Sequence, residues 1–101
     1  MRNRPVDNFL LEKWRMLDAA LVLQVLADHV KQDAEYEPRT SLGSTRWHAL
    51  VNGHDHELLC TGAKFFDTRT GKGGGGAVDL VMHLYQIDFK KATSLLAKRG
   101  M

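Results

Sequence analysis

Cysteine and proline are scarce in this chain, and long apolar runs are missing. The single cysteine, Cys60, cannot form an internal disulfide or an all-cysteine metal site, so any zinc site would need histidines. No apolar run approaches the ~18 residues of a membrane span. The first residues are not followed by the apolar segment that is typical of a signal peptide. We therefore expect a cytoplasmic protein with no membrane partner.

What the chain does contain predicts a folded domain. With an apolar fraction of 44% and only 2 prolines, the chain is too apolar and too poor in proline for a disordered protein. Its 101 residues leave no room for two domains. Charge is unevenly distributed: residues 1–57 carry seven Lys and Arg against nine Asp and Glu, whereas residues 58–101 carry seven against three. A basic half favours a phosphate-bearing partner, although ordinary solvated surfaces reach the same balance.

Two helices are predicted at the start of the chain. Apolar residues recur at helical spacing over residues 8–17, and Trp14 is the largest of them. Asp18 can cap a second helix that runs to about Lys31. The following segment, from Gln32 to Ser44, lacks periodicity and is predicted to be a loop.

A hairpin is predicted around Asn52-Gly53, because a type I′ turn needs positive φ at both central residues. Paired residues then have numbers of opposite parity, which places Trp47, Leu58 and Cys60 on one face, the core face.

A third strand is predicted over Lys64–Asp67, in which Phe65 and Phe66 must point to opposite sides of the sheet. Residues 68–76, TRTGKGGGG, are predicted to be a turn, followed by an apolar helix over 77–85. Asp88 can cap a last helix with a basic outer face that includes Lys90 and Lys91.

The glycine run formally matches a nucleotide-binding pattern. Gly71 to Gly76 fits G-x-G-x-x-G, but a Rossmann site needs a βαβ unit, which the remaining residues cannot form. A P-loop is excluded because Lys72 is followed by Gly73. Two interpretations stay open: exposed backbone N–H groups that hold a phosphate ahead of the helix, or a tight turn that lets helix and sheet approach closely.

Neither a metal site nor a catalytic site is expected. His54, His56 and Cys60 share a strand face but supply too few donors for zinc, and His83 is interpreted as a surface or boundary residue of its helix. No nucleophile stands beside a base, and a core-facing Cys60 should be an inert thiol. We therefore expect no cofactor and no enzymatic activity.

The stretch FFDTRTGKGGGGAVDLVMHL, followed by Phe89-Lys90-Lys91-Ala92, resembles a known family. From Asp18 to the end, the order is similar to the N-terminal zinc-binding domain of bacterial and phage-type DNA primases. In that family an aromatic strand enters a Cys-x-x-Cys turn, and a Gly-Gly step opens a short helix. The chain has no cysteine around residues 44–48 or 67–72, where the thiolates would lie, so it looks like the zinc-less variant found on replication proteins of mobile elements.

The resemblance implies an α+β fold: a small three-stranded antiparallel sheet, zinc-ribbon-like without metal, flanked by N-terminal and C-terminal helices. Residues 1–17 would be a helical extension and residues 18–101 the primase-like domain. Without zinc, aromatic packing by Trp14, Trp47, Phe65 and Phe66 would hold the domain together.

The resemblance also implies a non-catalytic module that binds single-stranded DNA in primase-type replication, with a primase, polymerase or helicase as a protein partner. Either Trp47 or Phe66 would stack on a base. The other expected contacts are Arg46, Lys64, Arg69, Lys72, Lys90, Lys91 and the backbone of Gly73 and Gly74. The alternative is a protein-interaction module that binds a replication partner or a second copy and ignores DNA.

Overall fold

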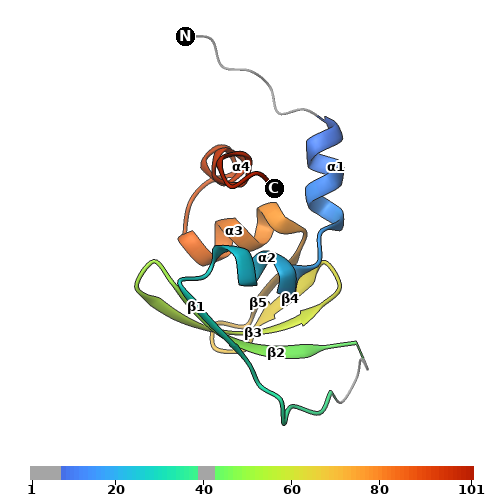
Figure 1. The fold of residues 1–101 in the computed structure, drawn as a ribbon, viewed down its shortest axis with the longest axis vertical. Helices are drawn as coiled ribbons and strands as arrows, with labels where there is room; N and C mark the ends of the chain where they lie inside the picture. Colours follow the sequence, from blue (N-terminus) through green and yellow to red (C-terminus); the bar gives the residue numbers. More distant parts are fainter. Residues whose placement is uncertain (1–7, 39–42) are drawn as a thin grey trace.

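The computed structural model describes residues 8–38 and 43–101 and has its helices on one side of an antiparallel sheet (Figure 1). The strands pair in chain order, β1-β2-β3-β4-β5, each antiparallel to the next. The predicted α+β class is confirmed, but the predicted three strands are wrong because the sheet has five. The elements are α1 (Asn8–Met16), α2 (Ala19–Leu26), β1 (His29–Gln32), β2 (Thr45–Val51), β3 (His54–Thr61), β4 (Lys64–Asp67), β5 (Lys72–Gly75), α3 (Ala77–Tyr85) and α4 (Phe89–Lys98).

The β2–β3 hairpin forms as predicted. Asn52 and Gly53 have φ values of 51° and 81°, the positive values that a two-residue type I′ turn requires. Trp47 lies opposite Leu58, which is the predicted parity. The core face of this hairpin is therefore the expected one.

The second helix is shorter than predicted, and the first added strand follows it. Helix α2 ends at Leu26 instead of about Lys31, and Ala27 is already extended at φ −70° and ψ 144°. β1 then pairs with β2, Val30 lying opposite Ala49. Pairing with β2 satisfies backbone groups on both strands, which outweighs the apolar pattern that would continue the helix.

The glycine segment contains the other added strand. β5 pairs with β4 within the predicted turn, although glycine has a poor preference for strands. A Cβ atom on Gly73 would lie 2.9 Å from the Phe65 carbonyl oxygen, and one on Gly74 would lie 3.0 Å from the Phe65 ring and 3.1 Å from Asp79 of α3. Close approach of strand and helix therefore requires these glycines, as the second interpretation of the run predicted.

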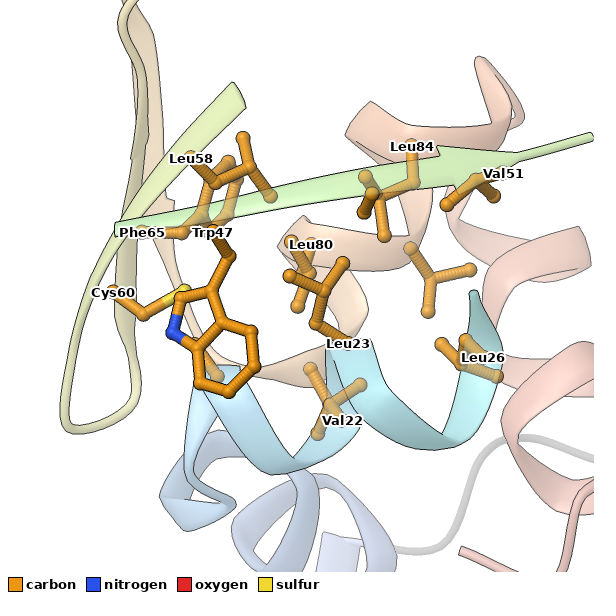
Figure 2. Packing of buried hydrophobic residues seen from close by; sticks show 14 of the residues in the cluster. Val22, Leu23, Leu26, Trp47, Val51, Leu58, Cys60, Phe65, Leu80 and Leu84 are labelled. Atoms are coloured by element: carbon orange, nitrogen blue, oxygen red, sulfur yellow. The ribbon is translucent and has the colours of Figure 1, made fainter. Parts of the chain in front are cut away.

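One hydrophobic cluster joins the sheet to the helices (Figure 2). Figure 2 shows Leu23 of α2 and Leu80 of α3 packed over Leu58 and Phe65 of the sheet. Trp14 of α1 is 1% exposed and belongs to the same cluster. The N-terminal helix is thus part of the core.

The last helix begins as predicted. The Asp88 carboxylate accepts a hydrogen bond from the Lys91 backbone N–H at 2.9 Å, and α4 packs against α3. Lys90 and Lys91 are exposed. Over residues 8–38 and 43–101, the helices are all too short or too polar to cross a membrane.

Candidate functional site

The sheet has a face that the described helices leave uncovered. Side chains alternate along each strand, so the neighbours of the core residues point the opposite way. Arg46, Leu59 and Phe66 lie side by side across β2, β3 and β4 on this second face. Figure 1 shows the described helices on the other side of the sheet. We call this second side the open face.

Phe66 is the aromatic group of the open face. Its side chain is 45% exposed, whereas Phe65 is 5% exposed, so the predicted split between the two rings is confirmed. A surface hollow beside Phe66 is walled by Leu59 and bordered by Thr61 and Lys64. Within the described part of the chain, Lys64 forms no ion pair, so its ammonium group is available to a ligand.

Arg46 lies on the open face but is already paired. Its guanidinium is 2.6 Å from a Glu57 carboxylate oxygen and 4.0 Å from one of Asp33. The hydrogen bond with Glu57 raises the pKa of Arg46, and the same bond, with a second from Thr68, lowers the pKa of Glu57. Because its charge is neutralised, Arg46 is a weaker phosphate contact than the sequence predicted.

Trp47 cannot be the stacking residue. It is 8% exposed on the core face, and its indole N–H donates to the Thr45 hydroxyl at 2.8 Å. The ring is used in packing, so Phe66 is the one of the two predicted aromatics that can meet a base. Conversely, the exposure of Phe66 removes it from the set predicted to replace zinc in the core.

The predicted basic contacts fall into separate places. Lys64 is on the open face, whereas Arg69 lies in the β4–β5 connection and Lys72 is the first residue of β5. Lys90 and Lys91 are on α4, which packs against α3 on the helical side of the sheet (Figure 1). These cations do not form one continuous surface.

Two glycine N–H groups ahead of α3 already have hydrogen-bond partners, and that of Gly76 donates to the Ala63 carbonyl oxygen at 2.8 Å. The Gly75 N–H donates to a carboxylate oxygen of Asp79 at 3.2 Å, and Asp79 lies in the first turn of α3. A carboxylate at this position already compensates the positive end of the helix. Gly73 and Gly74, predicted to contact DNA through their backbone, lie in β5, where the lack of a Cβ atom permits close packing against β4 and α3.

Sequence reasoning missed a polar cluster on the helical side of the sheet. It consists of His56 of β3, Asp67 of β4 and His83 of α3, which can offer ligand atoms that all lie within 4.8 Å of one another. His54, His56 and Cys60 share one face of β3 as predicted, but His54 is exposed and Cys60 is buried, and only His56 belongs to the cluster. Among the described residues, this cluster is the set that could hold a metal.

Hydrogen bonds and burial set the charges in this cluster. Burial alone would raise the pKa of Asp67, but the hydrogen bond with His83 and two backbone N–H donors, from Thr70 and Arg69, outweigh it, so the pKa is lowered. Burial lowers the pKa of His56, and the neighbouring His83 adds to the effect. These surroundings therefore favour the ionised form of Asp67 and the neutral form of His56.

A signal for this cluster was present in the sequence. Parity places His56 on the core face of β3, and alternation places Asp67 on the same side as Phe65. Buried polar groups need partners, so two of them beside a core helix that carries a histidine predict a polar contact.

Cys60 matches its prediction. It is 2% exposed, and burial raises the pKa of its thiol to about 12. A thiol with so high a pKa is not a nucleophile at neutral pH.

Comparison with known proteins adds a partial similarity. No protein-family model matches the chain, and no solved structure matches it. A protein of Zymomonas mobilis subsp. mobilis, described as a 65 kDa protein, is 46% identical over 46 residues, which cover 46% of this chain and 8% of that protein. Because this description gives a mass and no activity, the primase resemblance stays a prediction.

Proposed function

We propose that this chain is a non-catalytic module that binds single-stranded DNA through the open face, in primase-type replication of a mobile element. The observation that carries the proposal is the half-exposed ring of Phe66 beside Lys64, whose ammonium group forms no ion pair with the described residues. Base stacking on an aromatic ring tolerates any sequence, and a nearby cation binds the backbone. A single stacking ring with a cation beside it makes a weak, sequence-tolerant site.

The test is fluorescence anisotropy with a labelled single-stranded oligonucleotide. Stacking of one base contributes about 1–3 kcal/mol, so Phe66→Ala should weaken binding roughly 5- to 150-fold. Lys64→Ala should reduce the salt slope by about 0.7, the value for one phosphate contact on a single strand. Circular dichroism of each variant checks that the fold is kept.

Matched controls lie on the helical side of the sheet. Lys90→Ala and Lys91→Ala remove the same charge from α4 and should leave the affinity and salt slope unchanged. Equal losses from the Lys64 and Lys90 variants would mean that binding is not localised to the open face. Absence of binding by the unaltered chain at low salt would refute the proposal.

A second function has its own observation, a set of exposed apolar side chains near α2. Leu21 and Val25 are 53% and 48% exposed and lie one helical turn apart, and Met16 before α2 is 79% exposed. Apolar groups at these positions favour a protein-interaction module. Size-exclusion chromatography with light scattering separates the two functions: an oligomer that Leu21→Ser disrupts, together with no DNA binding, would support the second.

A further inference from the structure

A pocket of about 290 Å³ opens between the β2–β3 hairpin, the β4–β5 connection and the end of α3. Its walls include His56, Asp67 and His83, with Arg69 and Asp55 also lining it. The pocket is on the helical side of the sheet and is separate from the open face. We propose that His56, Asp67 and His83 bind one divalent transition-metal ion of the zinc class, with its remaining coordination position open to this pocket.

The donors come from three different elements, so the surrounding core holds them in place. Their side chains are 12%, 4% and 10% exposed for His56, Asp67 and His83. The Asp67 Oδ2 atom lies 2.7 Å from His83 Nε2 and 4.0 Å from His56 Nδ1. Ligands of a tetrahedral zinc ion are separated by roughly 3.3 Å, since each lies about 2.0 Å from the metal. Small side-chain rotations would therefore complete the site.

The orientation of Asp67 suits a ligand. Its Oδ1 atom accepts hydrogen bonds from the backbone N–H groups of Arg69 and Thr70 at 2.9 and 3.1 Å. These bonds fix the carboxylate and direct Oδ2 to the two imidazoles. Such outer contacts are the usual support of a metal-binding carboxylate.

The third side chain, His56, distinguishes this cluster from an ordinary hydrogen-bonded pair of His83 and Asp67. Among the described residues, the buried Nε2 atom of His56 has no hydrogen-bond partner, and its Nδ1 atom lies 4.0 Å from Asp67, beyond hydrogen-bond distance. A buried imidazole without a hydrogen bond is unfavourable, and a neutral imidazole that makes none can coordinate a metal through either ring nitrogen. The His83–Asp67 contact alone leaves His56 unexplained, whereas a shared ion uses all three side chains.

The donor types select the class of ion. Two imidazoles and one carboxylate suit zinc and its neighbours among the transition metals, whereas calcium and magnesium prefer oxygen ligands. Three protein ligands leave a position for water or a substrate, as in open zinc sites. The site meets the thiolate positions that the primase resemblance implies at Asp67 alone, because His56 and His83 lie outside residues 44–48 and 67–72.

The experiment uses the full chain, stripped with a chelator and titrated with Zn²⁺ by calorimetry and with Co²⁺ by absorbance. We expect one equivalent of either ion and a Co²⁺ spectrum of low coordination number. His56→Gln, His83→Gln and Asp67→Asn should each weaken Zn²⁺ binding at least roughly tenfold. Asp67→Asn keeps an oxygen that can accept the two backbone hydrogen bonds, so its fold should survive.

His29→Gln is the matched control, because it removes an exposed histidine from β1, outside the cluster. It should leave Zn²⁺ binding unchanged. Circular dichroism identifies any variant that unfolds. If His83→Gln unfolds, Zn²⁺ binding is compared for His56→Gln and Asp67→Asn alone. Failure of the unaltered chain to take up Zn²⁺, or uptake that the folded cluster variants retain at full strength, would overturn the proposal.

Discussion

Replacement of Trp14 by alanine tests whether the N-terminal helix belongs to the core. The indole is 1% exposed, so the substitution removes nearly its whole buried surface. Truncation of a buried tryptophan costs about 3–5 kcal/mol. Within residues 8–38 and 43–101 the buried indole N–H has no partner, and its removal returns part of that cost, so we expect a loss near 3 kcal/mol. Domains of this kind are stable by about 5–15 kcal/mol, so the variant should fold but unfold at clearly lower urea.

Urea unfolding followed by circular dichroism measures this loss, provided that the free energy of unfolding falls with urea at the same slope in the variant and in the unaltered protein. Met16→Ala is the control on the same helix, because Met16 is 79% exposed and its loss should change stability by less than about 0.5 kcal/mol. Trp14→Phe should cost less than Trp14→Ala, since it keeps most of the packing and removes the unpaired N–H. A cost below about 1 kcal/mol for Trp14→Ala would show that α1 does not stabilise the domain.

Two further predictions concern the thiol and the glycine strand. Cys60 has a pKa raised to about 12 by burial, against 9.0 for the ordinary thiol, so the folded state keeps a proton that the unfolded state releases above pH 9. Stability should therefore fall as pH rises from 9 toward 12, by about 1 kcal/mol at pH 10 from this group, and Cys60→Ala should unfold with a shallower pH dependence. An identical dependence in both proteins would contradict the burial argument. Gly73→Ala places a Cβ atom 2.9 Å from a backbone oxygen and should cost roughly 1–3 kcal/mol, whereas Gly75→Ala meets only a Lys64 side-chain carbon at 3.8 Å and should be nearly neutral. Thermal unfolding of the two variants measures the difference, and equal melting temperatures would count against close packing of β5.

Local chemistry made part of the fold predictable. Asn52-Gly53 specifies its own turn, and the Asp88 cap needs only a carboxylate three residues before an N–H group. Phe65 and Phe66 were assigned to opposite faces because alternation holds for any strand. These features depend on neighbours in the chain, which is why one sequence suffices.

The features that were missed depend on distant partners. β1 follows an apolar helix without a break in pattern, and only the edge of β2 makes it a strand. β5 consists of residues with poor strand preference and is held by its contact with β4.

The cluster of His56, Asp67 and His83 spans three elements. Asp67 lies 11 residues after His56 and 16 residues before His83, so no local sequence motif predicts the cluster. The β3–β4 register and the packing of α3 on the sheet bring them together, and neither could be derived before the number of strands was known.

The chain order of the sheet bears on how fast this domain can assemble. Every strand pairs with a strand next to it in sequence, so no distant segment has to be captured before pairing begins. Low separation between contacting residues speeds folding, because little chain entropy is lost before contacts form. The β2–β3 hairpin can close first and the remaining strands can add on either side, which limits the time that unpaired strand edges are exposed to aggregation during synthesis.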